Sequence, residues 1–543
     1  GNYNLAIGHQ ALSATTTADY NVAVGRSALF TNILGSRSTA IGISALETQN
    51  YATATDAYNV AVGYTAGVNV TTGLMNTLIG AEAGDALTDA DYNVAVGKEA
   101  LGSDTLGSKS VAIGTSALYT QNFTSATDAY NTAVGHNAGT NVTTGVANTL
   151  IGGLAGDALT DADYNTAVGY GALSSDTLGS NSVAIGTGAL TTQNFTTATN
   201  AYNTAVGRLA GLSVTTGVQN VLIGGLAGDA LTDADYNVAI GIEALSADTL
   251  GSGSTAIGRN ALSTQNFTTA TTTNNTAVGD RAGLAVTTGT DNTLIGSLAG
   301  AAVTDGNTNT AMGSYSLYTN QRGDRNTAIG HEALKVMNPS GDVDAYNTAV
   351  GYQSGLAVTT GQRNTFIGAL AGDATVDSSD NVAVGHDALG ADSGGTCVAV
   401  GGDALRLNTG YDNTALGFNA GGSVTSASNT MLLGHDAGVT GSPGGSISTQ
   451  VNTLVIGDEN VGAANIQVDW TVASDQRDKT DFTALDLGLD FVKALAPVTY
   501  KWDKRSKYGD KTADDYDLNA QTPDGTHKED WLDIGFKAQE VQT

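Results

Sequence analysis

Short apolar segments recur along the chain at a nearly constant interval. Each has the pattern Asn-[Thr/Val]-Ala-[Val/Ile]-Gly, as in Asn165–Gly169, and copies run from Asn4–Gly8 to Thr453–Gly457. β-branched residues two positions apart, with a small residue between them, are typical of a strand whose successive side chains point to opposite faces. Each copy therefore predicts one short strand that ends at a glycine, where a positive φ or a close backbone approach is required.

The spacing of these segments predicts how the strands are arranged. There are 26 closing glycines, and as far as Gly385 they are separated by 17, 17, 17 and 21 residues in turn, a 72-residue cycle that carries Gly42 to Gly114, Gly186, Gly258 and Gly330; beyond Gly385 the spacings are 16, 16, 17 and 23. So regular a period is typical of a solenoid. We predict an all-β fold, a β-solenoid (β-roll) of about 26 short coils over residues 1–465, with two short strands and two turns in each coil. At roughly 4.8 Å per stacked strand, the array would be about 120 Å long.

Both faces of each predicted strand are apolar, which raises the question of what covers them. We expect the β-branched residues to fill the coil and the alanine to meet something that approaches closely. A second copy of the chain is the economical candidate, so the pattern predicts a homotrimer. The Asn that opens most copies can bond to local backbone, and stacked Asn side chains are expected to form a ladder.

The 21-residue coils contain a four-residue insertion that should protrude, as at Thr192–Thr199. Their aromatic residues are expected to be the most exposed apolar side chains of the array. Two interpretations remain open: these rings pack under the loop, or they make repeated weak contacts with a glycan. The residues concerned are Tyr51, Phe123, Phe195 and Phe267.

Composition and charge reduce the number of functions that the chain could have. The net charge of −30 argues against a nucleic-acid partner, because phosphate binding requires a basic surface. No apolar run approaches the ~20 residues needed to span a bilayer, so membrane insertion is not expected. The single cysteine, Cys397, is expected to be a buried free thiol. Since the sequence opens inside a repeat, we expect an N-terminal attachment region to precede it.

The composition changes near Ile466, and all three tryptophans lie beyond that point. Residues 483–495 have helical periodicity that Pro497 ends, and residues 498–502 follow as a predicted strand. We therefore predict a separate, small α+β domain over residues 466–543.

Two resemblances add to this interpretation. The repeat, as at Ser182–Gly186, resembles the head repeats of trimeric bacterial adhesins of the YadA type, which are trimeric β-rolls, and the same motif occurs in phage tail fibres. The C-terminal segment resembles the intramolecular chaperone of phage fibres, the peptidase S74 family. Its motifs occur here in order as Ser474–Lys479, Pro497–Trp502 and Ile534–Val541.

The chaperone resemblance implies that three chains are assembled into a fibre and that the domain then cuts itself off near the serine of the first motif. By this resemblance Ser474 would be the nucleophile and Lys479 its general base, with Asp475 and Arg477 shaping the site. A lysine can act as a base when burial or neighbouring charges lower its pKa. The alternative is that Ser474–Lys479 is an exposed hinge. Any enzyme activity would thus be at most autoproteolysis, with none in the shaft.

Pairs of aspartates also recur every 72 residues and could hold Ca²⁺ together with backbone carbonyls. Acidic turns are the favoured interpretation, because the glycine-rich consensus of calcium repeats is absent, and we expect no cofactor. The six residues are Asp89, Asp91, Asp161, Asp163, Asp233 and Asp235. The histidines have no metal-ligand spacing.

Together, these observations predict a structural and adhesive tail fibre in the phage virion, a trimeric spacer that presents contacts for a host cell-surface glycan or protein receptor and binds other tail proteins. The leading alternative is a trimeric adhesin or extracellular filament on a bacterial cell surface. A polysaccharide-degrading tailspike is a further, less favoured alternative.

Overall fold

The computed structural model describes residues 1–463, 465, 498–503, 508 and 520–535. The chain divides into two compact units, Gly1–Gly462 and Ala463–Thr543. The described residues are all-β, and the first unit is a solenoid of about 25 turns. Within this part of the chain there is no helix with the length and apolar character to cross a bilayer.

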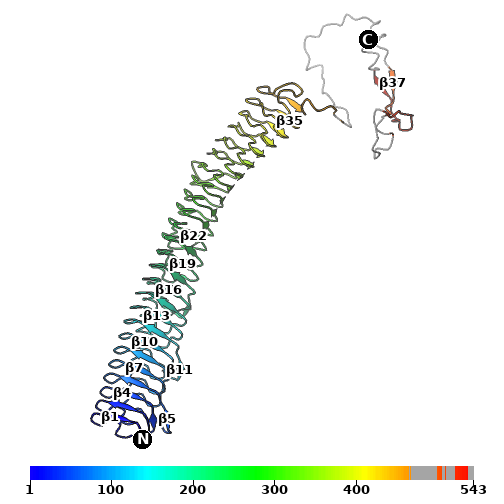
Figure 1. Ribbon diagram of the computed structural model, residues 1–543. Helices are drawn as coiled ribbons and strands as arrows, with labels where there is room; N and C mark the ends of the chain where they lie inside the picture. Colours follow the sequence, from blue (N-terminus) through cyan, green and yellow to red (C-terminus); the bar gives the residue numbers. More distant parts are fainter. Residues whose placement is uncertain (464, 466–497, 504–507, 509–519, 536–543) are drawn as a thin grey trace. The chain divides into compact units, whose positions relative to one another are not determined.

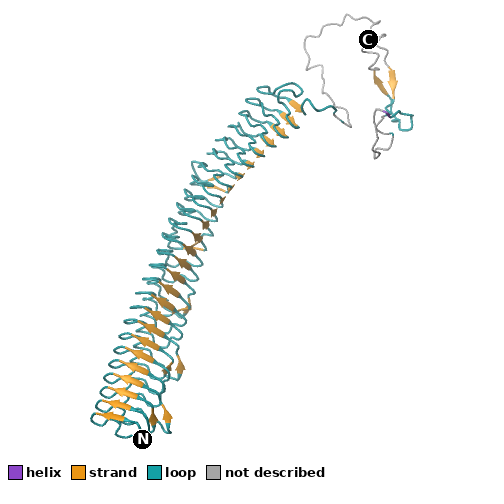
Figure 2. Cartoon of the chain, viewed as in Figure 1, coloured by secondary structure: helices purple, strands orange, loops and turns teal. Residues whose placement is uncertain are grey.

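Each coil of the solenoid contributes one three-residue strand, and the coils stack in chain order (Figures 1 and 2). The strands are β1 (Leu5–Ile7), β2 (Val22–Val24), β4 (Thr39–Ile41), β6 (Val60–Val62), β7 (Thr77–Ile79), β8 (Val94–Val96), β10 (Val111–Ile113), β12 (Thr132–Val134), β13 (Thr149–Ile151), β14 (Thr166–Val168), β16 (Val183–Ile185), β18 (Thr204–Val206), β19 (Val221–Ile223), β20 (Val238–Ile240), β22 (Thr255–Ile257), β24 (Thr276–Val278), β25 (Thr293–Ile295), β26 (Thr310–Met312), β28 (Thr327–Ile329), β30 (Thr348–Val350), β31 (Thr365–Ile367), β32 (Val382–Val384), β33 (Val398–Val400), β34 (Thr414–Leu416), β35 (Met431–Leu433) and β36 (Leu454–Ile456).

These strands form one 26-stranded parallel sheet in exact register. For example, Ala167 of β14 lies opposite Leu150 of β13 on one side and Ala184 of β16 on the other. The regular spacing of the motif along the sequence thus places equivalent residues of successive coils one above another. The predicted solenoid is confirmed.

The glycine that ends each strand permits this close stacking. Gly152 and Gly169 have φ values of +133° and +138°, a region that residues with a Cβ rarely adopt. A Cβ on Gly152 would also lie only 2.5 Å from the carbonyl oxygen of Gly169 in the next coil. Both the backbone conformation and the available space therefore require glycine.

The orientation predicted for the strands is wrong. The central alanine of each strand, such as Ala167, is fully buried inside its own coil, whereas the flanking residues Thr166 and Val168 are only half-buried. The physical reason is the narrow coil. Its interior is filled by the strand alanine together with a leucine from the turn after it, such as Leu173, and this leaves no room for two β-branched side chains. The β-branched residues therefore point outward.

Leucine replaces the central alanine in one coil of each 72-residue cycle, and glycine then replaces leucine in the turn. Leu150 is fully buried, and Cβ atoms placed on Gly139 or Gly156 would lie 2.6 and 2.7 Å from its methyl groups. In the following coil the arrangement is reversed, with Ala167 in the strand and Leu173 at the position equivalent to Gly156. The coil interior is thus filled by exchanging volume between strand and turn.

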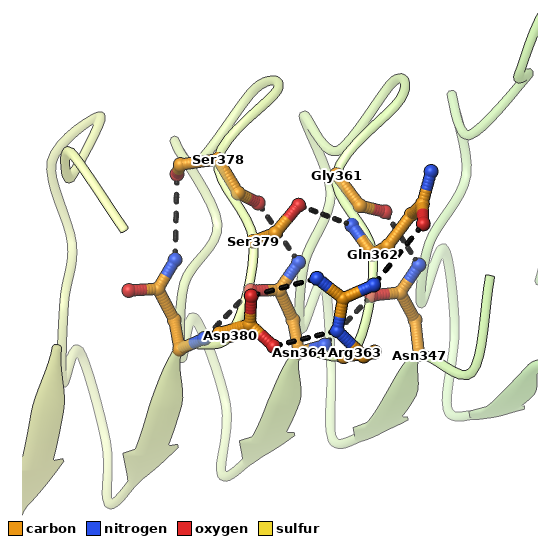
Figure 3. A network of polar contacts seen from close by, with 9 residues as sticks. Asn347, Gly361, Gln362, Arg363, Asn364, Ser378, Ser379 and Asp380 are labelled. Atoms are coloured by element: carbon orange, nitrogen blue, oxygen red, sulfur yellow. Dashed lines mark hydrogen bonds and ion pairs between the residues drawn. The ribbon is translucent and has the colours of Figure 1, made fainter. Parts of the chain in front are cut away.

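The predicted Asn ladder is present and buried. The amide N–H of Asn165 donates to Oδ1 of Asn148 at 2.9 Å, and Nδ2 of Asn165 donates to the carbonyl oxygen of Gly179 at 2.9 Å. Figure 3 shows the same arrangement at Asn347 and Asn364, where Asn364 N donates to Asn347 Oδ1 at 3.0 Å. Each side chain joins its coil to the neighbouring coils, so the ladder satisfies buried backbone groups along the stack.

A second strand does not occur in every coil as predicted. It is found where a 21-residue coil stacks on the coil before it. Five pairs of two-residue parallel strands occur there. These are β3 (Gly35–Ser36) with β5 (Thr55–Asp56), β9 (Gly107–Ser108) with β11 (Thr127–Asp128), β15 (Gly179–Ser180) with β17 (Thr199–Asn200), β21 (Gly251–Ser252) with β23 (Thr271–Thr272), and β27 (Gly323–Asp324) with β29 (Val343–Asp344).

In the C-terminal unit the described residues contain one antiparallel pair, β37 (Val498–Tyr500) and β38 (Asp533–Gly535). β37 lies within the strand predicted at residues 498–502. The helix predicted at residues 483–495 lies outside the described residues.

Candidate interaction surface and cleavage motif

The four residues of the predicted cleavage motif, Ser474, Asp475, Arg477 and Lys479, lie outside the described residues. The solenoid, by contrast, is described throughout, so its surfaces can be examined residue by residue.

The aspartate pairs proposed as calcium ligands take part in contacts between coils. Asp89 Oδ1 accepts a hydrogen bond from Thr72 Oγ1 at 2.5 Å, and Asp91 Oδ1 accepts one from the amide of Leu74 at 2.7 Å. The same two contacts recur one and two cycles later, at Asp161 with Asp163 and at Asp233 with Asp235. These carboxylates therefore link each acidic turn to the coil before it.

Two other groups in the described part of the chain bring three possible metal ligands together, with ligand atoms within 4.8 Å of one another. They are His386 with Asp387 and Asp403, and His435 with Asp436 and Asp458. In both groups the histidine follows a closing glycine and one carboxylate comes from the next coil. Spacing along the sequence could not reveal them, because the stacking of coils joins the ligands.

The aromatic residues of the 21-residue coils are buried, so the expectation that they are the most exposed apolar side chains is wrong. The exposed fraction is 5% for Phe123, 5% for Phe195 and 7% for Phe267, and 6% for Tyr51. The interpretation that they pack under the loop is correct. The exposed loop residues Thr196 and Thr197 follow Phe195 directly, and the Phe195 ring lies against Gly179 of the preceding coil, where an added Cβ would lie 2.7 Å from it.

A buried polar network fixes each of these rings. Asp104 is fully buried; its Oδ1 accepts hydrogen bonds from the amides of Gly107 at 3.0 Å and Phe123 at 3.3 Å, and its Oδ2 accepts one from Gln121 Nε2 at 2.5 Å. Gln121 Oε1 in turn accepts from Asn131 Nδ2 at 2.8 Å. Burial raises the pKa of the Asp104 carboxyl despite these donors. Asp176 and Asp248 make the same contacts in later cycles.

The outward side of the 26-stranded sheet runs along the whole solenoid. Each strand presents its first and third residues there, and these are Thr, Val, Leu, Met or Ile in every strand. Two positions in each of 26 strands give 52 positions without a charge, whereas the chain average of 14% charged residues would place about seven there. Solvated sheet faces normally carry polar side chains. We call this surface the strand face.

A column of tyrosines borders one edge of the strand face. In nine coils the residue directly before the motif Asn is Tyr, with an exposed fraction of 48% to 78% and a left-handed φ of 50° to 61°. This conformation is unfavourable for a bulky residue, so neither burial nor backbone preference explains tyrosine here. The tyrosine column consists of Tyr3, Tyr20, Tyr58, Tyr92, Tyr130, Tyr164, Tyr202, Tyr236 and Tyr346.

Cations from coils without tyrosine stack on several of these rings. The guanidinium of Arg37 lies 5.0 Å from the ring centroid of Tyr20 and 5.6 Å from that of Tyr58. The ammonium of Lys109 lies 5.1 Å from the ring centroid of Tyr130. The tyrosine column is therefore a surface that accepts cationic side chains.

The opposite edge of the strand face is formed by the residue directly after each closing glycine, which we call the trailing column. Its large members are exposed; Tyr64, Tyr170 and Ile242, for example, expose 56%, 63% and 58% of their surface. The histidines that directly follow a closing glycine, such as His136, belong to this column.

Comparison with known proteins bears on the C-terminal unit of the chain. Residues 474–543 match the model of the peptidase S74 family, the chaperone of endosialidase. No curated protein matches the chain. The family match implies a phage-associated extracellular protein. A β-solenoid of about 25 turns that precedes a C-terminal segment matching the chaperone of endosialidase family fits a bacteriophage tail fibre.

Proposed function

We propose that this chain forms the shaft of a homotrimeric phage tail fibre, in which the strand faces of three copies pack against one another along the fibre. The observation that carries the proposal is the strand face itself. Its residues are half-buried to exposed in the single chain, it contains no charged residue in 26 successive strands, and it belongs to a chain of net charge −30. Removing its β-branched side chains from water would stabilise the assembly by an amount that grows with every rung.

The number three rests on the resemblance of the repeat to trimeric β-rolls and of the C-terminal segment to an assembly chaperone. A trimeric fibre of this length would act as a stiff spacer in the virion tail. It would bind other tail proteins and carry contacts for a glycan or protein receptor on the host surface, where repetition along the shaft turns weak contacts into avidity.

The C-terminal segment would assemble the trimer and then release itself. Ser474 Oγ would attack the carbonyl carbon of a peptide bond at or beside Ser474, while Lys479 accepts the hydroxyl proton and returns it to the departing amine. Water would then hydrolyse the ester, which regenerates the serine and leaves a new carboxylate. Assembly before cleavage is reasonable, because three registers must be aligned before long-range strand contacts become favourable.

Light scattering and mass spectrometry of the expressed chain test this proposal. The chain of 54.5 kDa is expected to assemble into a particle of about three chain masses, which falls to three shaft masses once a cut at or beside Ser474 releases the C-terminal segment. The variant Ser474→Ala should remain trimeric and uncut, and Lys479→Arg should also be uncut, because guanidinium stays protonated. A stable monomer would overturn the oligomeric proposal, and an uncut wild-type trimer would overturn the cleavage proposal alone.

A further inference from the structure

From Tyr58 to Ile242 the two edges of the strand face vary together coil by coil, whereas in the coils that follow, large trailing residues such as Arg259, His331 and Phe418 also occur without a tyrosine. Every coil with a member of the tyrosine column has a large residue in the trailing column of the same coil. In chain order these residues are His9, Arg26, Tyr64, Lys98, His136, Tyr170, Arg208, Ile242 and Tyr352. The five coils without tyrosine between Tyr58 and Tyr236 have small residues in the trailing column instead, namely Ala81, Thr115, Gly153, Thr187 and Gly225. Before this stretch, the coil of Arg37 has Ile43 and is large at both edges.

Stacking within one chain accounts for the alternation of large and small residues in the trailing column, since a Cβ on Gly153 would lie 3.5 Å from the Tyr170 ring of the next coil, but it does not explain why the large residues of both columns fall in the same coils. Tyr164 and Tyr170 are six residues apart and are separated by the extended strand β14. At about 3.3 Å per residue they lie up to about 20 Å from each other, at opposite edges of the strand face. The two positions can meet only if one belongs to a different copy of the chain.

The symmetry of the assembly decides which edges meet. When three copies lie parallel around a common axis, each interface is heterologous, so the tyrosine column of one copy faces the trailing column of the next. When two copies lie antiparallel, each column faces itself. Only the parallel arrangement, without a shift along the axis, places the two edges of the same coil opposite each other in neighbouring copies.

The chemistry of the paired residues is consistent with such a contact. Arg26, Lys98 and Arg208 would each meet a tyrosine ring, a pairing that the chain already makes internally where Arg37 stacks on Tyr20. The other coils would pair Tyr with Tyr, His or Ile, all of which pack well against an aromatic ring. In the five coils without tyrosine between Tyr58 and Tyr236, the small trailing residue leaves no bulk to accommodate.

We infer that the tyrosine column of each copy packs against the trailing column of the next copy at the same coil, and that this contact sets the parallel, unshifted register of the fibre. The inference rests on the proposed homotrimer and deepens it by naming the contact that aligns the copies. The partner of this surface is therefore a second copy of this chain.

Cysteine cross-linking in the full chain tests the register. In a Cys397→Ser background, which removes the only native thiol, the variant Tyr164→Cys/Tyr170→Cys places one thiol at each edge of the same coil. Both positions are exposed in the single chain, so the coil interior is unaffected. A short bis-maleimide linker is expected to join the chains covalently, up to a closed trimer on a denaturing gel.

Matched controls shift one thiol by a coil. Tyr164→Cys/Gly153→Cys and Tyr164→Cys/Thr187→Cys should cross-link much less, and Tyr164→Cys alone should give no linked chains. Cross-linking that is strongest in a shifted pair would overturn the unshifted register, and cross-linking of the single variant would overturn the parallel arrangement. Light scattering of each variant separates the two proposals: an assembled trimer that no pair links refutes this inference alone, whereas a monomer refutes the proposed function itself.

Discussion

At the scale of single residues, the direction in which a side chain points decides its role. Ala167 fills a coil interior that is closed on all sides, whereas Val168, the next residue, lies on the strand face. The two positions are equally apolar in sequence, yet one contributes to folding of the single chain and the other is available to a neighbouring chain.

This difference predicts opposite outcomes for the same substitution. Ala167→Asp places a charge in the coil interior without a partner and should destabilise the solenoid by several kcal/mol, with a lower thermal unfolding midpoint. Val168→Asp should leave the single coil folded but weaken assembly, because the charge is buried only between copies. Circular dichroism and light scattering of both variants make the comparison; unfolding of the coil by Val168→Asp, with Ala167→Asp tolerated, would show that the assigned directions are wrong.

At the scale of elements, strand and turn share one interior volume. Leu150 in β13 lies against Gly156, whereas the next coil has Ala167 against Leu173 at the equivalent positions. Leucine is accepted in that turn although its φ is +54°, nearly the +56° of Gly156. The backbone therefore tolerates either residue, and side-chain volume selects between them.

Exchanging the large and the small residue between strand and turn tests whether the two positions share one interior. Leu150→Ala alone should cost about 2–5 kcal/mol through the cavity that it leaves, and Gly156→Leu alone should be destabilising through overpacking. The double variant, which copies the neighbouring coil, should be more stable than the sum of the two single effects. Denaturant unfolding of all four proteins gives the coupling, and additive effects would mean that the two positions do not share an interior.

At the scale of the whole molecule, the repeat places buried carboxyl groups with shifted pKa values in several coils, and their effects on stability add up. Burial raises the pKa of Asp85, Asp104, Asp157, Asp229 and Asp373, which lie at recurring positions of the coils. A carboxyl with a raised pKa in the folded state binds its proton more tightly when folded than when unfolded. Its stabilising contribution is therefore complete below the unfolded pKa of about 3.9 and is lost as the pH rises through the folded pKa.

We accordingly expect the solenoid to become more stable as the pH falls from 7 toward about 4. Thermal unfolding across this range measures the effect, and it should persist in high salt, because salt screens surface charges but not burial. Asp104→Asn should reduce the slope, since Asn32 already occupies the equivalent position and accepts the same amide hydrogen bond from Gly35 at 3.0 Å. A stability that is constant with pH, or that falls on mild acidification, would contradict this expectation.

The sequence by itself determined the strands, their order and the length of each coil, because the pattern Asn-Thr-Ala-Val-Gly and its spacing are local properties. It also indicated the glycine conformation and the Asn ladder, which follow from the chemistry of single residues repeated at one place in the coil. The C-terminal motifs that include Ser474 pointed to the chaperone family from residue order alone.

Only the tertiary structure decided which face of each strand is inside. Alternation shows that Ala167 and Val168 point in opposite directions, but which direction is inward depends on the room that Leu173 and its equivalents leave within the coil. The same holds for Phe123, whose burial depends on the insertion folding over it, and for the tyrosine column, which exists only because stacking places residues many positions apart one above another. Local patterns specify the strand and turn of each coil. The volume inside the coil and the stacking of coils specify which side chains are buried and which lie on the surface.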